Sequence, residues 1–289
     1  MNNFRGSLLM VGSMAGFAIE DMFIKLLADQ MPVGQILILL GLGGGAIFWG
    51  LLARQGKAFW TRDLLHPTLM LRNGLEMIGT MGFVTALATI PLTSATAILQ
   101  ATPLVVVLAA ALFLKEKVGH RRWSAVFIGL FGMLLIVQPG QDTFDPQYLY
   151  AVIGVLGLAG RDVITRRVPT HFPSLQLAGS AFFMVVPAGV VLLILSDQSM
   201  RMPDPMGVFL VACAIVTGLI AYLTIVVATR IAEASAIAPF RYARLVFGLL
   251  IGVLIFSEEP DIWTYIGGAI IVSSGLYTFA RESRLKLRR

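Results

Sequence analysis

Long apolar segments and short polar connections alternate along almost the whole chain. The apolar residues form continuous runs and do not alternate with polar ones, which favours helices over a membrane β-barrel. A helix needs about 20 predominantly apolar residues to cross the hydrocarbon core of a bilayer. Ten segments reach roughly this length: residues 6–28, 33–53, 68–89, 93–114, 122–138, 148–166, 174–195, 206–229, 234–256 and 262–280. The pattern therefore predicts an all-α membrane protein with ten transmembrane helices.

Composition supports this prediction. Hydrophobic residues make up 57% of the 289 positions and charged residues only 13%, whereas a soluble domain carries about 25% charged residues. The single cysteine, Cys213, excludes an intrachain disulfide and a cysteine-based metal site. The three histidines lie at expected segment ends with no second ligand at metal spacing. We therefore expect no metal and no cofactor.

The chain also repeats itself. When the sequence is shifted by 141 positions, the separation of Asp21 and Asp162, unusual residues fall on matching ones. The matches are Gly16 with Gly157, Ala18 with Ala159, Asp21 with Asp162, Lys25 with Arg166, Pro32 with Pro173, Gln35 with Gln176, Ser94 with Ser235 and Ala97 with Ala238. One inserted residue later, Glu116 matches Glu258. Matched charges, glutamines and prolines inside apolar segments rarely arise by chance.

This repeat predicts two five-helix halves, residues 1–140 and 141–289. Because five is odd, the second half enters the membrane inverted relative to the first. Inverted repeats are typical of secondary transporters, whose substrate site lies between the repeats near the middle of the bilayer. Small-residue pairs such as Gly12 with Gly16 indicate close helix packing within the chain, with a homodimer as the alternative.

Basic residues orient the predicted helices. If both termini are cytoplasmic, almost all lysines and arginines outside the apolar segments lie on the cytoplasmic side, and Arg201 lies on the other. This is the positive-inside pattern. It predicts a multi-pass protein of a bacterial-type plasma (inner) membrane, with the bilayer as its partner. We interpret the basic C-terminal tail as a topology signal and expect no nucleic-acid partner.

Ionisable residues inside the apolar segments are the candidate functional groups, because each costs about 2.5–3.5 kcal/mol to insert without a partner. Those present in both halves are Asp21 with Lys25 and Asp162 with Arg166, each pair four residues apart on one helix face. We interpret them as structural ion pairs or gates, with direct substrate contact as the alternative. Gln35 and Gln176 are interpreted as structural cross-links.

Groups present in one half are stronger candidates for substrate binding or gating, because a substrate has no two-fold symmetry. They are Glu20, Arg72, Glu76, Gln100, Arg161, Arg241, Tyr242 and Arg244. Arg72 and Glu76 form either an intrahelical salt bridge or part of a site. Arg241 and Arg244 have no acidic partner on their own helix, so their partners come from Glu20, Asp21, Glu76 or Asp162, or from the substrate. Tyr242 is a candidate aromatic wall, with plain packing as the alternative.

Residues Ala95 to Gly140 resemble the fourth and fifth helices of the drug/metabolite transporter superfamily, EamA type. The resemblance rests on Pro103-Leu104, on Glu116 after a long apolar run, on Arg122-Trp123, and on Gly129 and Gly132. It extends over nearly the whole chain and departs where Arg241 and Arg244 replace an apolar stretch. The run Pro239 to Phe247 resembles a subgroup that includes riboflavin importers. The resemblance implies transport of a small organic solute.

Together these features predict a secondary transporter that works by alternating access. The sequence contains no phosphate-binding loop, and its short connections leave no room for a nucleotide-binding domain. Uptake of a riboflavin-like, planar and polar metabolite is the first hypothesis, and export of amino acids or other metabolites is the second. An intramembrane lipid-modifying enzyme is the alternative of another class. The scattered carboxylates argue against it, and we expect no enzymatic activity.

Overall fold

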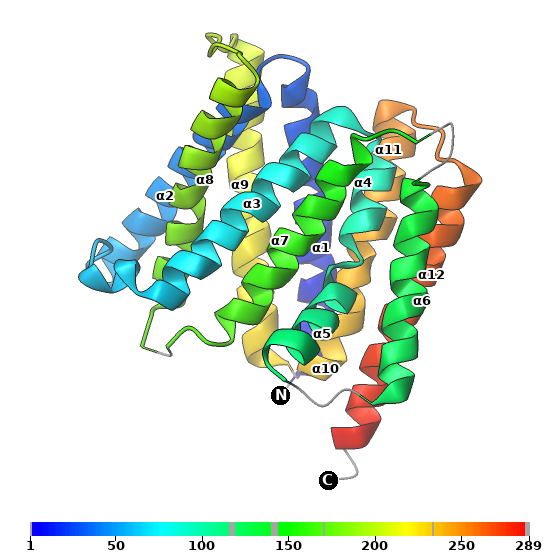
Figure 1. The fold of residues 1–289 in the computed structure, drawn as a ribbon. Coiled ribbons are helices and arrows are strands. Elements are labelled where there is room, and N and C mark those ends of the chain that lie inside the picture. The colour runs from blue at the N-terminus through cyan, green and yellow to red at the C-terminus, as the bar shows by residue number, and fades with distance from the viewer. Residues whose placement is uncertain (1, 116–118, 140–143, 170, 233, 287–289) are drawn as a thin grey trace.

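The computed structural model describes residues 2–115, 119–139, 144–169, 171–232 and 234–286 (Figure 1). Within these ranges, every regular element is a helix. The longer helices are α1 (Asn3–Ala28), α2 (Val33–Arg54), α3 (Pro67–Thr89), α6 (His120–Val137), α7 (Tyr148–Thr165), α8 (Ser174–Leu195), α9 (Pro205–Ile231) and α12 (Ile262–Lys286). The shorter ones are η1 (Arg62–Leu65), α4 (Leu92–Leu99), α5 (Thr102–Phe113), α10 (Ala234–Ile237), η2 (Ala238–Tyr242) and α11 (Ala243–Phe256).

Helices lie at all ten predicted segments, but two of the segments are not continuous. The segment 93–114 divides into α4 and α5, and 234–256 divides into α10, η2 and α11. Pro103 is the second residue of α5 and Pro239 the second residue of η2. Proline lacks an amide N–H and fits the first turn of a helix, so each proline favours a new helical start at this point.

Within the described residues, seven helical stretches are long and apolar enough to cross a membrane. They are Asn3–Ala28, Val33–Arg54, Leu92–Phe113, Tyr148–Thr165, Ser174–Leu195, Pro205–Ile231 and Ala238–Phe256. Helix α3 is long enough, but Arg72, Asn73 and Glu76 lower its hydropathy. Both termini lie at the same end of the molecule (Figure 1). The crossing of all ten segments stays a prediction.

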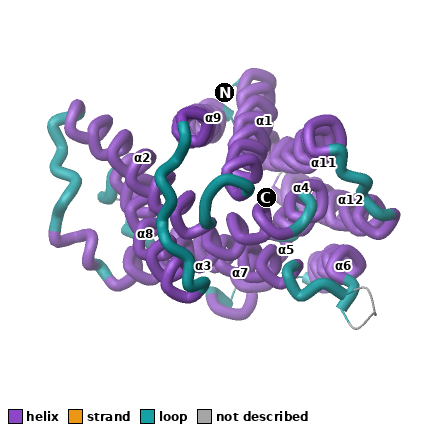
Figure 2. The backbone as a smooth tube through the Cα atoms, turned by 90° about the horizontal axis from the view of Figure 1, so that it is seen from above, coloured by secondary structure: helices purple, strands orange, loops and turns teal. Residues whose placement is uncertain are grey.

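The helices pack mainly in four pairs: α2 against α8, α3 against α7, α1 against α9, and α6 against α12 (Figure 2). Each pair joins a helix from the predicted first half to one from the second. Glycines line these crossings: a Cβ added to Gly189 would overlap the carbonyl of Gly34, and one added to Gly157 would overlap Gly79. Since lipid supplies no hydrophobic drive for helix association, such close backbone packing holds the bundle together.

Two duplicated glutamines tie the longer connecting segments to the other half. Gln35 of α2 donates to the carbonyl of Arg201 at 2.6 Å and accepts from its amide N–H at 2.8 Å. Gln176 of α8 donates to the carbonyl of Phe59 at 2.8 Å. Arg201 lies between α8 and α9, and Phe59 between α2 and α3. The two amides thus make the same kind of contact at opposite ends of the α2–α8 pair.

The α2–α8 crossing predicts the effect of an added side chain. We expect Gly189→Leu to lower the free energy of unfolding by about 1–3 kcal/mol, the usual cost of overpacking. Gly50 of α2 has open space where its Cβ would lie, so Gly50→Leu is the matched control and leaves stability unchanged. Thermal melting of the detergent-solubilised protein measures both. Equal melting temperatures for the two variants would contradict this packing.

Candidate functional site

Within the described residues, charged side chains of the predicted membrane segments meet in two clusters. In the first, Arg244 of α11 binds Asp21 of α1 through three N···O contacts of 2.7, 2.8 and 3.0 Å. The guanidinium also lies 5.2 Å from the ring centre of Phe17 and 5.4 Å from that of Phe83. Asp21 is only 2% exposed. Two parallel hydrogen bonds and two aromatic faces are the partners that suit a planar guanidinium.

The second cluster joins α3 to α7. Arg161 Nη1 lies 2.9 and 2.8 Å from the two carboxylate oxygens of Glu76, and Arg72 Nη2 lies 3.2 Å from one of them. Arg161 Nε also lies 2.8 Å from Asp162. Arg72 Nη1 donates to Asn73 and to the carbonyl of Leu177 on α8. This cluster has two arginines and two carboxylates, so its formal charges balance.

The four-residue spacing predicted that Asp21 pairs with Lys25 on the same helix, and the structure corrects this prediction. Asp21 pairs with Arg244 and not with Lys25 one turn away, and Asp162 pairs with Arg161. The Asp21–Arg244 pair joins two helices, because close packing brings opposite charges from neighbouring helices together, whereas Arg161 and Asp162 are adjacent residues of α7. The Arg72–Glu76 salt bridge is present as expected, with Arg161 added to it. Arg166 is exposed directly after α7, and its pairing with Asp162 stays a prediction.

Lys25 takes part in a tie at the end of the bundle opposite the termini. Its Nζ donates to the carbonyl of Ile90 at 2.8 Å and lies 3.6 Å from Glu258. The Glu258 carboxylate accepts from the backbone N–H groups of Leu92 at 2.6 Å and Thr93 at 2.9 Å. It therefore caps the N-terminus of α4, where a negative charge is stabilising. We call these contacts the Lys25–Glu258 tie.

The remaining candidates have different surroundings. Gln100, at the break between α4 and α5, donates to the carbonyl of Arg241 at 3.2 Å. The Arg241 side chain is exposed, and no ion-pair partner for it lies among the described residues. Tyr242 is 5% exposed and lies against Gly275 of α12. Glu20 is half-buried, with its carboxylate against Gly218 of α9.

Sequence reasoning did not identify Glu258, Asn73 or Phe83 as part of these networks. The match between Glu258 and Glu116 was the available signal for Glu258, because it marks both residues as features of the repeat. Glu116 itself lies outside the described residues. No group of three His, Cys, Asp or Glu side chains in the described ranges is placed to hold a metal ion.

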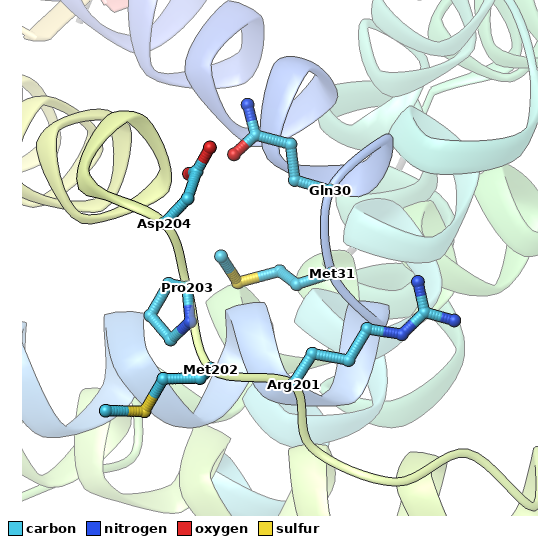
Figure 3. Close-up of a pocket in the computed structure, with 6 residues that line it drawn as sticks. All are labelled: Gln30, Met31, Arg201, Met202, Pro203 and Asp204. Carbon is cyan, nitrogen blue, oxygen red and sulfur yellow. The ribbon is translucent and has the colours of Figure 1, made fainter.

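A shallow depression of about 250 Å³ lies at the end of the bundle opposite the termini (Figure 3). It lies between the α1–α2 turn and the segment before α9, and its lining consists of Gln30, Met31, Arg201, Met202, Pro203 and Asp204. None of the clustered residues lines this depression, so it is separate from the clusters. The clusters are therefore the candidate site.

Comparison with known proteins identifies the class of the molecule. The model of the EamA-like transporter family matches the chain twice, at residues 4–138 and 146–279. The chain belongs to the EamA-like transporter family. The resemblance inferred from the sequence is thereby confirmed, and the two matches cover nearly the same ranges as the predicted halves. Membership makes the chain a membrane transporter of small metabolites.

Three relatives show the range of solutes that similar EamA proteins move. The chain is 26% identical over 229 residues to an S-adenosylmethionine uptake transporter of Rickettsia felis, covering 79% of this chain and 76% of the relative. It is 30% identical over 220 residues to a riboflavin transporter of Vibrio cholerae, covering 76% and 73%. It is 26% identical over 273 residues to the pseudopaline exporter CntI of Pseudomonas aeruginosa, covering 92% and 93%. These relatives include an uptake transporter and an exporter.

A solved crystal structure has the same fold. It aligns with a TM-score of 0.58 at 20% sequence identity, covering 95% of this chain and 98% of the other. The similarity therefore extends over the whole EamA bundle and supports the arrangement of its helices, without indicating a substrate.

The Asp21–Arg244 pair predicts strong coupling between the two positions. Asp21→Asn and Arg244→Gln each leave one buried charge without its partner, which costs about 3–5 kcal/mol in soluble proteins. We expect the double variant to be more stable than the sum of the single effects predicts, by about 0.5–3 kcal/mol. Unfolding of the four proteins in detergent measures this coupling. Asp21→Asn with Arg201→Gln, an exposed arginine, is the control pair and is additive; additivity in both pairs contradicts the assignment.

The Lys25–Glu258 tie predicts how one end of the bundle opens. Thr93 is fully buried beneath the Glu258 carboxylate. In a Cys213→Ser background, we expect Thr93→Cys to react faster with a membrane-impermeant maleimide when Glu258→Gln is added. The neutral amide no longer attracts Lys25 and accepts less strongly from the α4 N–H groups. Glu259→Gln, at the next and exposed residue, is the control; equal rates in both variants would show that Glu258 does not hold this end closed.

Proposed function

We propose that this chain is a secondary transporter that imports a planar, polar metabolite by alternating access between its halves, residues 1–140 and 141–289. Ten helices cross a bacterial-type inner membrane in this proposal, with both termini in the cytoplasm. Riboflavin is the first candidate substrate. The placement of intramembrane charge is the main support. Asp21–Arg244, Glu76–Arg161 and Lys25–Glu258 each join a helix of one half to the other half.

Ion pairs between the halves suit a rocking mechanism. A tightly packed apolar contact between two helices resists separation, because each lost contact leaves a void. An ion pair can be exchanged for water or for a substrate group when one half moves against the other. Alternating access in transporters with inverted repeats is largely a rigid-body rocking of one repeat against the other. The four helix pairs that join the halves support this arrangement.

Arg241 is the proposed substrate contact. Asp21 already occupies the guanidinium of Arg244, whereas the exposed side chain of Arg241 has no ion-pair partner within the described ranges. Its carbonyl is fixed by Gln100, which holds the backbone of η2 in place. A guanidinium stacks on a flat heterocycle and donates to its ring oxygens and nitrogens. A flavin ring provides both kinds of contact.

S-adenosylmethionine is the second candidate, because relatives named as its uptake transporters match 79% of this chain. It shares with riboflavin a flat nitrogen heterocycle that carries a hydroxylated five-carbon unit. The two differ in charge, since S-adenosylmethionine bears a sulfonium and an amino-acid group. Export of another metabolite is the remaining alternative, and the similarity to a pseudopaline exporter supports it. An intramembrane enzyme has no such support.

Growth of a bacterium that neither makes nor imports riboflavin tests the proposal. We expect the chain to allow growth on low external riboflavin and Arg241→Ala to abolish it at equal membrane abundance. Arg241→Lys keeps the charge but removes the planar fork, so we expect intermediate growth. The same cells are tested for uptake of labelled S-adenosylmethionine. Failure to take up either compound, with the protein present in the membrane, would contradict the proposed substrate class.

A further inference from the structure

Glu20 differs from the other carboxylates in the middle of the helices. Asp21, Glu76 and Asp162 each have an arginine within 3.0 Å of the carboxylate. Glu20 has no hydrogen-bond donor and no basic partner among the residues that the structure describes. Its counterpart in the second half is Arg161, so the repeat provides no second copy of this group.

The surroundings of Glu20 provide no direct hydrogen-bond or ion-pair partner for a negative charge among the described residues. Its carboxylate lies against Gly218, where an added Cβ would overlap it. The nearest charges are Asp21 on its own helix and Arg244, and the Arg244 guanidinium already binds Asp21. Other ionisable groups on elements packed against α1 lie on α2, α3, α9 and η2: Arg54, Arg72, Glu76, Cys213, Tyr222, Arg230, Arg241 and Tyr242. Between Gly207 and Thr229, helix α9 carries no acidic or basic residue.

These contacts favour the neutral acid in this conformation. An ionised carboxylate beside Asp21 is repelled by a like charge, and without a counter-ion at this depth it loses its hydration at a cost of several kcal/mol. A protonated carboxyl group carries no such penalty and needs fewer partners.

We propose that Glu20 carries a proton through the transport cycle and couples transport to the proton gradient. In the conformation described here its O–H bond is intact. When the halves rearrange and water reaches Glu20, the O–H bond breaks, the proton passes to water and the carboxylate stays behind. The reverse step on the other side of the membrane restores the acid. This proposal rests on the proposed transport function and adds its energy source.

Infrared spectroscopy of the purified full-length protein in lipid tests the protonation without any substrate. We expect a carbonyl band of a protonated carboxylic acid at neutral pH, which Glu20→Gln removes. Glu259→Gln, at an exposed carboxylate, leaves the band unchanged. Glu20→Asp keeps an acid at the site and shifts the band without abolishing it, which separates loss of the group from loss of the fold. A band that persists in Glu20→Gln overturns the proposal.

Proteoliposomes test the coupling. We expect an imposed proton gradient to accelerate uptake of labelled riboflavin or S-adenosylmethionine by the wild type. Glu20→Gln loses this acceleration but still exchanges labelled for unlabelled substrate, because exchange needs no net proton movement. Wild-type uptake that ignores the gradient overturns the coupling. If neither compound is transported at all, the proposed substrate class fails, while the infrared band still decides whether Glu20 holds a proton.

Discussion

The absence of water around most of the chain is the constraint on which the structure depends. Inside a bilayer every backbone polar group must find a partner within the protein, which leaves helices as the solution for continuous apolar runs. The same condition applies to charged side chains, which are tolerated when they pair across helices. Asp21 with Arg244 and Glu76 with Arg161 satisfy it, and both pairs lie at interfaces between the two halves. Helix packing, charge placement and the candidate site thus have one common cause.

The sequence predicted the helices well because apolar length is a local property. All ten expected segments contain helix, and the two interrupted segments break beside Pro103 and Pro239. The ion pairs were harder to predict. Spacing of four residues indicated Asp21 with Lys25, but it takes no account of which neighbouring helix lies opposite each face. The sequence left Asp21 as one of four possible acidic partners of Arg244, 223 residues away, and the packing of α1 and α11 selects it.

The repeat supplied information that single residues did not. It separated duplicated groups such as Gln35 and Gln176, which form similar contacts to connecting segments, from groups found in one half. Among the groups found in one half, Arg72 and Arg161 both pair with Glu76. Glu20 and Arg241 do not take part in the described ion pairs. The repeat therefore reduced the number of candidate functional charges to those found in one half. The ion pairs in the structure then separated the paired candidates from those without a described ion pair.

The α2–α8 pair has a mechanical consequence. Gly34 and Gly189 bring the two backbones into contact, and Gln35 and Gln176 fasten a connecting segment at each end of the pair. Each connecting segment is bound by a glutamine of the other half, so it moves with that other half. The pair therefore resists sliding and separation, and it has the properties of a fulcrum. Rotation about it would open one end of the bundle as the other closes, with the largest displacements in the helices farthest from this axis, α6 and α12.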